Sequence, residues 1–177
     1  KGVSYIKSNL LNKEEVEKLP LDQCDIIYML VAMTGTKNGF SQYREFINLN
    51  EVTLLNLLSA LVEKGSKARL VFPSSRLVYK GKKNSFLAED SPKEAKTLYA
   101  ANKISCELHL ESWANAFGIN YTTFRICVPY AKLLPNQYSY GTLGFMINQA
   151  KTNGEITLYG DGSQKRTFSH VEDICRI

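Results

Sequence analysis

A tyrosine and a lysine stand four residues apart at Tyr99 and Lys103. In a helix this spacing places both side chains on one face, about one turn apart. The ammonium would then favour the phenolate and lower the pKa of Tyr99 from its ordinary value of about 10. Such a phenol can act as a general base on a sugar or alcohol hydroxyl near neutral pH. By itself the pair also fits a half-buried tyrosine beside a lysine that extends to solvent.

A hydroxyl that could join this pair comes earlier in the chain, at Ser75. It follows the apolar run 68–72, which predicts a buried strand. In open α/β sheets ligands bind beyond the carboxyl ends of the strands. Ser75 could therefore donate a hydrogen bond to the oxygen on which Tyr99 acts, although Ser74-Ser75 also fits an ordinary turn at the end of a strand.

The elements that would position these residues alternate between strand and helix. A continuous apolar run at 25–32 is typical of a strand buried on both faces. Gly65 and Gly118 stand where helix C-caps are expected. The alternation favours a parallel α/β sheet with right-handed crossovers. Strands are predicted at 3–6, 25–32, 68–72, 120–127 and 155–158, and helices at 14–19, 43–63, 98–117 and 141–153.

Composition limits the classes of function. The 177 residues are 44% hydrophobic and 22% charged, which is the balance of a globular domain with a core. No apolar stretch approaches the roughly 20 residues that cross a bilayer, so we expect no membrane partner. A net charge of +5 suits anionic small molecules as well as nucleic acid. Because the lysines are scattered, we expect no nucleic-acid partner.

Cysteine and histidine spacing argues against a metal site. The four cysteines form no C-x-x-C pair, and the chain has only two histidines. Cys24 and Cys127 lie beside or within strand-like runs. Buried, reduced thiols of this kind predict a cytoplasmic protein.

Five motifs together resemble a known family. The chain carries Ser-Ser-Arg-Leu-Val-Tyr at 74–79, Tyr-x-x-x-Lys at 99–103, Arg-x-x-x-Pro-Tyr at 125–130, Leu-Tyr-Gly-Asp-Gly at 158–162 and Arg-Thr-Phe-Ser-His-Val-Glu-Asp at 166–173. In this order and spacing they resemble the nucleotide-sugar epimerase/dehydratase branch of the extended short-chain dehydrogenases/reductases. The resemblance covers nearly the whole chain. It implies a Rossmann-type, doubly wound parallel sheet and NAD or NADP as the cofactor.

The resemblance assigns catalytic roles to three residues. Tyr99 would be the catalytic acid/base. Lys103 would bind the nicotinamide ribose and tune Tyr99, and Ser75, which also touches the substrate, would complete the triad.

The cofactor-binding residues follow from the same resemblance. Leu30, Val31 and Ala32 match the strand end that passes the phosphates and ribose of the cofactor. Pro129 matches the proline beside the nicotinamide. Asn50 matches an asparagine that supports the site, but it also fits an ordinary residue on a helix surface.

Two residues are implied in substrate binding. Val128 replaces an asparagine that often contacts the sugar nucleotide, and Arg166 matches an arginine that meets its diphosphate. Without the resemblance Arg166 would be a plain surface residue. Arg76 and Leu77 follow Ser75 where sugar 4,6-dehydratases carry an Asp-Glu pair, which disfavours dehydration.

The chain departs from the family at the phosphate-binding loop, because it contains no G-x-x-G-x-x-G. By the resemblance, residue 1 falls just before the third strand of the sheet. We therefore expect a partial NAD(P)-binding domain at 1–130 and the start of a substrate-binding portion at 131–177. The first βαβ segment and most of the substrate domain would be missing, so this piece is expected to be inactive alone.

Three functions stay open. The first is a nucleotide-sugar epimerase, which would remove and return hydride at one sugar carbon. The second is an NAD(P)-dependent keto-sugar or ketone reductase on the same scaffold. The third is a non-catalytic relative that binds a ligand or partner. Two long helices, 43–63 and 98–117, form a dimer interface in the family, so a homodimer is implied by the resemblance alone.

Overall fold

The computed structural model describes residues 2–35, 38–82, 85–131, 141–158, 160–163 and 165–177. The chain forms two compact units, residues 1–125 and residues 126–177. Among the described residues, no helix combines the length and the apolar composition that a membrane crossing needs.

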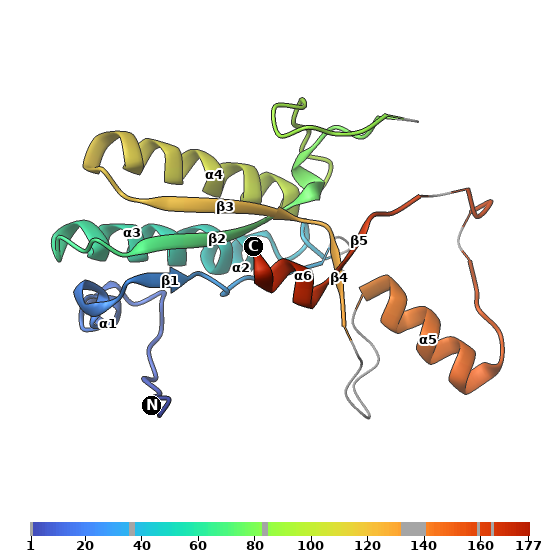
Figure 1. The fold of residues 1–177 in the computed structure, drawn as a ribbon, viewed down its shortest axis with the longest axis horizontal. Coiled ribbons are helices and arrows are strands. Elements are labelled where there is room, and N and C mark those ends of the chain that lie inside the picture. The colour runs from blue at the N-terminus through green and yellow to red at the C-terminus, as the bar shows by residue number, and fades with distance from the viewer. Residues whose placement is uncertain (1, 36–37, 83–84, 132–140, 159, 164) are drawn as a thin grey trace. The chain divides into compact units, whose positions relative to one another are not determined.

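The first unit is built on three strands in the order β1-β2-β3 (Figure 1). These are β1 (Ile26–Tyr28), β2 (Arg69–Ser75) and β3 (Tyr121–Ile126). β1 and β2 are parallel, with Ile27 opposite Leu70. The predicted α/β class with a parallel sheet is therefore confirmed.

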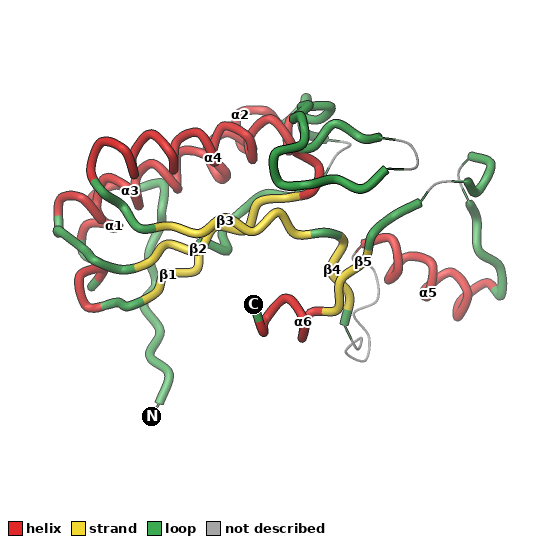
Figure 2. Tube along the Cα trace, turned by 45° about the horizontal axis from the view of Figure 1, so that its top comes forward, coloured by secondary structure: helices red, strands yellow, loops and turns green. Residues whose placement is uncertain are grey.

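The helices α3 (Thr53–Glu63) and α4 (Leu98–Phe117) lie on the same face of this sheet (Figure 2). Burial along β2 shows the consequence. Up to Ser74 the strand alternates, because Leu70, Phe72 and Ser74 are buried while Arg69, Val71 and Pro73 are exposed or partly exposed. Because side chains alternate between the faces of a sheet, this pattern belongs to a strand covered on one face only.

The long helix predicted at 43–63 is present, but it is interrupted. It runs as α2 (Tyr43–Ile47), a π-helical turn (Asn48–Val52) and α3. The buried leucines of α3 join β2 and α4 in the core cluster. A π-helical turn inside a helix is often found at a functional site, and this one contains the buried Asn50.

The helix predicted at 98–117 has the same bounds in α4. Thr97 caps its first turn, because the Thr97 Oγ1 accepts from the Ala100 amide at 3.1 Å. Gly118 ends it with a φ of 71°, a left-handed conformation that favours glycine. The capping residues therefore fix the helix that carries Tyr99 and Lys103.

Three strand predictions were wrong. Residues 3–6 and 155–158 form no strand, and the strand predicted at 25–32 shrinks to β1. The physical reason is pairing, since an apolar run becomes a strand only where a neighbour completes its ladder of hydrogen bonds. β1 pairs only with β2 among the described residues, so Ile26 and Tyr28 stay 49% and 62% exposed.

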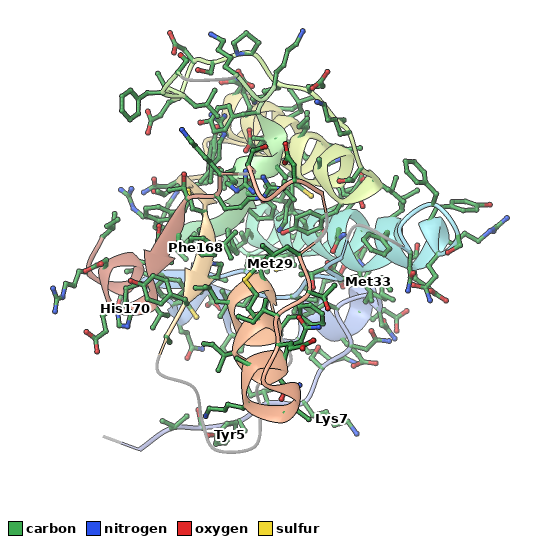
Figure 3. The ribbon with its side chains drawn as sticks, turned by 90° about the vertical axis from the view of Figure 1, so that its right-hand side faces the viewer. Tyr5, Lys7, Met29, Met33, Phe168 and His170 are labelled. Atoms are coloured by element: carbon green, nitrogen blue, oxygen red, sulfur yellow. The ribbon has the colours of Figure 1, made fainter. Side chains whose placement is uncertain are left out.

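The remaining short helix of the first unit, α1 (Lys13–Glu17), matches the predicted helix at 14–19. The second unit contains β4 (Val128–Tyr130), α5 (Gly141–Asn153), β5 (Phe168–His170) and α6 (Val171–Arg176). β4 and β5 pair in parallel, and Figure 3 labels Phe168 and His170 on β5. The Tyr130 and His170 rings meet edge to face, with their centroids 5.1 Å apart.

Candidate active site

Lys103 is the best-defined group of the predicted triad. Its side chain is only 3% exposed, and its Nζ donates to the Pro73 carbonyl oxygen at 2.7 Å. The same Nζ lies 4.4 Å from the centroid of the Phe72 ring and 5.7 Å from that of Tyr99. The ammonium therefore stands between the end of β2 and the phenol, as a four-residue spacing in α4 dictates.

Burial sets the ionisation of the groups around this lysine. Desolvation lowers the pKa of Lys103, and the nearby Cys106 partly opposes the shift. Burial also raises the pKa of the Cys106 thiol to about 12. The thiol therefore stays protonated at neutral pH, and its Sγ donates to the Asn50 carbonyl at 3.1 Å.

Ser75 is the last residue of β2 and is 9% exposed. Its Oγ accepts from the Leu77 amide at 3.2 Å and so caps the 3₁₀ turn Arg76–Val78, which packs against α4. Ser75 follows, by two residues, the carbonyl that Lys103 holds. The first unit thus contains all three residues of the predicted triad, with Lys103 joined to β2 and facing Tyr99. Their catalytic roles stay predictions.

Asn50 holds the segment that follows β1. Its Oδ1 accepts from the Met33 amide at 2.7 Å, and its Nδ2 donates to the Met33 carbonyl at 3.2 Å. Met29 and Met33, labelled in Figure 3, bracket the three predicted cofactor residues 30–32. Of these, Leu30 and Val31 are exposed. Asn50 is not a residue of the helix surface, because it is only 3% exposed.

A second asparagine extends this arrangement across α4. Asn102 accepts from the Asn50 Nδ2 at 3.3 Å and donates to the Glu51 carboxylate. Glu51 also accepts from the Ser105 Oγ at 2.7 Å, and His109 Nε2 lies 3.7 Å from the same carboxylate oxygen. A continuous hydrogen-bonded chain therefore runs from the Met33 backbone through the π-helical turn to Ser105 on α4.

Sequence reasoning did not single out Glu107, whose carboxylate accepts hydrogen bonds from three residues. Its Oε1 accepts from Ser74 Oγ at 2.6 Å and from Arg125 Nε at 3.0 Å. Its Oε2 accepts from Arg125 Nη2 at 2.9 Å and from Lys93 Nζ at 2.8 Å. A signal existed, because Glu107 stands four residues after Lys103 and so shares its helix face.

The cations that surround Glu107 decide its charge. Burial alone would raise the pKa of this carboxyl group. Hydrogen bonds from Arg125, Lys93 and Ser74 outweigh burial and hold its pKa at about 2. In turn, the hydrogen bond to Glu107 raises the pKa of Arg125 above its ordinary value. A carboxylate and two cations are therefore all ionised beside the end of β2.

Arg125 also secures the loop between Ser75 and Tyr99. Its Nη1 donates to the Tyr79 hydroxyl at 2.7 Å and to the Glu89 carbonyl at 2.6 Å. The guanidinium carbon lies 4.9 Å from the centroid of the Tyr79 ring. One arginine at the end of β3 thus connects α4 with two points of that loop.

The remaining predicted residues belong to the second unit. Val128 and Pro129 lie in β4, where Val128 donates its amide to the Thr167 carbonyl at 3.2 Å. Arg166 is exposed, and its Nη1 donates to the Lys165 carbonyl at 3.1 Å. Their substrate and cofactor roles stay predictions.

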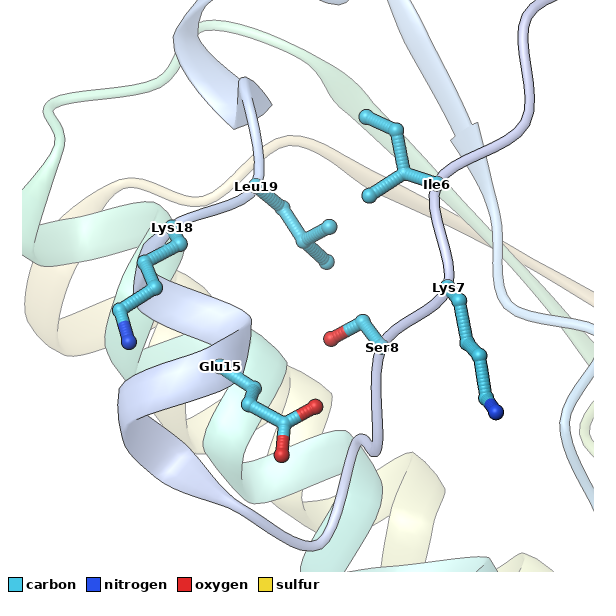
Figure 4. Close-up of a pocket in the computed structure, with 6 residues that line it drawn as sticks. All are labelled: Ile6, Lys7, Ser8, Glu15, Lys18 and Leu19. Atoms are coloured by element: carbon cyan, nitrogen blue, oxygen red, sulfur yellow. The ribbon is translucent and has the colours of Figure 1, made fainter.

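A small pocket of about 110 Å³ lies elsewhere in the first unit (Figure 4). The N-terminal segment and α1 form its walls, and no predicted site residue belongs to it. The residues that line the pocket are Ile6, Lys7, Ser8, Glu15, Lys18 and Leu19.

Over the described ranges, no three His, Cys, Asp or Glu side chains gather in a way that could hold a metal ion.

The sequence of the chain matches a protein family and curated relatives. The sequence model of the NAD dependent epimerase/dehydratase family matches residues 1–177. Among curated proteins, the chain is 25% identical over 173 residues to an uncharacterized UDP-glucose epimerase, YtcB, of Bacillus subtilis strain 168. That alignment covers 98% of this chain and 53% of the relative.

Solved structures of similar fold include two epimerases. A UDP-N-acetylglucosamine 4-epimerase from Methanobrevibacter ruminantium M1, in complex with UDP-N-acetylmuramic acid, matches with a TM-score of 0.83 and 29% identity over 97% of this chain and 55% of that one. A UDP-glucuronic acid 4-epimerase from Bacillus cereus, in complex with UDP-glucuronic acid and NAD, matches with a TM-score of 0.82 and 25% identity over 97% of this chain and 52% of that one. The chain spans about half the length of these relatives.

Proposed function

The chain belongs to the NAD dependent epimerase/dehydratase family, and from this premise we propose that it is part of an NAD(P)-dependent nucleotide-sugar epimerase. Ser75, Tyr99 and Lys103 would form its catalytic centre. The observation that carries the proposal is the buried Lys103, whose Nζ lies 2.7 Å from the Pro73 carbonyl and 5.7 Å from the Tyr99 ring centroid.

The lysine has two tasks in this proposal. A buried ammonium beside a phenol stabilises the phenolate, because opposite charges attract strongly where water is excluded. Tyr99 can then take the proton from a sugar hydroxyl and later return it. Ser75 donates its hydroxyl hydrogen to the same sugar oxygen, which holds the oxygen near Tyr99 as its charge changes.

The donor chemistry of this site fits the ribose end of a nicotinamide cofactor. Lys103 has three N–H donors, and the Pro73 carbonyl takes one of them, so the others suit ribose hydroxyls. Leu30, Val31 and Ala32 follow a parallel strand at the edge where such sheets bind dinucleotides. When bound, NAD or NADP supplies a reversible hydride acceptor. Pro129 is assigned to the nicotinamide side.

Epimerisation is favoured over dehydration by the residues after Ser75. Elimination of water from a sugar needs an acid/base pair of side chains, and the turn here carries Arg76 and Leu77. Leu77 has no group that exchanges a proton, and Arg76 has no carboxyl group, so the turn lacks the acid/base pair. Removal and return of hydride at one carbon would need, from this chain, only Ser75, Tyr99 and Lys103, with the nicotinamide of the cofactor as the hydride acceptor.

The proposed substrate is a sugar attached to a nucleoside diphosphate. The relatives described above are UDP-sugar epimerases by name. Arg166, with its planar guanidinium, suits a diphosphate. Val128 would line the sugar side.

We include a homodimer in the proposal. Tyr43 and Ile47 on α2 and Leu108 on α4 are 47%, 38% and 55% exposed, and these helices belong to the pair that the family resemblance assigns to an interface. Covering such side chains with a second copy would remove apolar surface from water.

The test uses the whole protein that contains this chain, supplied with NAD. UDP-sugars are incubated with it, and formation of the C4 epimer is followed by NMR. We expect Tyr99→Phe to lower kcat by about 10²- to 10⁴-fold, the usual contribution of a general acid/base. Tyr5→Phe is the matched control on a tyrosine that is 93% exposed, and it should keep wild-type kcat.

The competing functions give different results. Net consumption of NADPH with a keto-sugar, without epimer formation, indicates the reductase. Failure of the whole protein to bind any nicotinamide dinucleotide indicates the non-catalytic relative. A Tyr99→Phe protein with wild-type kcat contradicts the assigned acid/base.

A further inference from the structure

We propose that Glu107 is a positioning residue, which sets the direction of Ser75 by holding Ser74 against α4. The inference rests on the proposed function, because it assigns a second purpose to the helix that carries Tyr99 and Lys103. The observations that carry it are the hydrogen bonds between α4 and the last residues of β2.

Two successive turns of α4 form hydrogen bonds with two successive residues of β2. Lys103 donates to the Pro73 carbonyl at 2.7 Å, and Glu107 accepts from the Ser74 hydroxyl at 2.6 Å. Ser74 and Glu107 are 4% and 7% exposed, so water competes little for this bond. Together the two bonds fix both the position and the rotation of the strand end relative to α4.

The direction of Ser75 follows from the direction of Ser74. Ser75 directly follows Ser74 and opens the turn Arg76–Val78, which packs against α4. A strand end held at both Pro73 and Ser74 therefore leaves the Ser75 hydroxyl one direction. Ser75 keeps extended backbone angles, with φ at −143° and ψ at 146°. A strand end that could twist would let its hydroxyl swing away from a sugar oxygen held at Tyr99.

The cations around Glu107 hold its carboxylate in one orientation. Arg125 binds both carboxylate oxygens at 3.0 and 2.9 Å, and Lys93 binds one of them at 2.8 Å. Bidentate pairs of this kind have defined geometry as well as strength. The Glu107 carboxylate therefore cannot rotate to follow Ser74, and Ser74 must adapt to it.

The experiment is a double-mutant cycle on the NAD-loaded whole protein, with Ser74→Ala, Glu107→Gln and the double variant. Ser74→Ala removes only the hydroxyl that donates to Glu107 and leaves the Glu107–Arg125 pair in place. This variant therefore tests the proposal even if Glu107→Gln does not fold. The control is Ser59→Ala, the same change at a residue of helix α3 whose hydroxyl donates to Glu63 Oε1 at 2.9 Å. We expect Ser74→Ala to lower kcat about tenfold with KM within about twofold, because a misplaced group weakens the transition state more than binding.

The cycle separates positioning from general destabilisation. Residues that act through one bond give non-additive effects, so the double variant should lose no more kcat than Glu107→Gln alone. Additive losses overturn the proposal, as does a Ser74→Ala protein whose kcat equals that of Ser59→Ala.

A second readout needs no turnover. Hydrogen exchange of the 177-residue chain should be faster at residues 73–79 in Ser74→Ala than in Ser59→Ala, with helix α3 unchanged. If the wild-type protein converts no nucleotide sugar, the proposed function fails, and the exchange measurement alone decides whether Glu107 fixes the strand end. Unchanged exchange at 73–79 overturns the proposal.

Discussion

Charged side chains are buried in this molecule where the backbone or an opposite charge receives them. Lys103 meets a carbonyl, and Glu107 meets Arg125 and Lys93. Each would be costly to bury alone, since a desolvated charge without a partner destabilises the folded state strongly. The buried polar groups therefore lie at a defined site, where their burial lowers the free energy of unfolding.

Acid should lower the folding stability of the protein through protonation of Glu107. The pKa of Glu107 is about 2 in the folded protein, below its ordinary 4.5, so its contribution is complete above about pH 4.5 and is lost as the pH falls toward 2. A shift of this size corresponds to roughly 3 kcal/mol of folding stability. Urea unfolding followed by Trp113 fluorescence at pH 7, 4 and 3 measures this loss.

Two variants check the origin of that loss. Glu107→Gln should start less stable and lose little more between pH 7 and pH 3. Glu14→Gln, on the exposed side of α1, should keep the wild-type pH dependence. An equally steep acid loss in Glu107→Gln would show that other carboxyl groups cause it.

At the scale of elements, α4 is the structure on which the site depends. Its first turn carries Tyr99, its second Lys103 and its third Glu107, and all three face the end of β2 or one another. The helix was predicted with its observed bounds, and Gly118 is the local signal for its C-terminal end. The contacts of its third turn were not, since they depend on Arg125 and Lys93, which come from other elements.

The helix end supplies a prediction on stability. Gly118 has a φ of 71°, and a Cβ added there would meet no atom within 4 Å, so any cost is conformational. Gly118→Ala should lower the free energy of unfolding by about 1 to 2 kcal/mol, the cost of a left-handed non-glycine residue. Gly81→Ala is the control, because Gly81 has open space and no left-handed φ. Equal stabilities of the two variants in urea would contradict this account of the helix end.

At the scale of the whole molecule, the chain corresponds to about half of the structure of its relatives. The parallel strands, the helices on one face and the Tyr99–Lys103 pair are there, while β1 has one neighbouring strand among the described residues. The chain spans about half the length of its relatives. Ile26 and Tyr28 of β1 are exposed, while Ile27 between them packs against the core cluster.

The last prediction concerns cofactor binding by these residues alone. The 177-residue chain has no G-x-x-G-x-x-G, and that loop lets backbone amides approach a pyrophosphate. Calorimetric titration with NAD or NADP should therefore detect no binding in the micromolar range. The same titration on the UDP-glucuronic acid 4-epimerase of Bacillus cereus, whose structure contains NAD, is the positive control. Micromolar affinity of the 177 residues alone would show that the site needs no such loop.

The sequence by itself determined the elements whose signals are local. Helical spacing, Gly65 and Gly118 specify the long helices, and spacing alone puts Tyr99 and Lys103 on one face. The tertiary structure decided what depends on neighbours distant in the chain. It decided which apolar runs found a pairing strand, that Asn50 is buried against Met33, and that Glu107 holds Ser74. Strand pairing and buried ion pairs join residues far apart in sequence, so no local pattern records them.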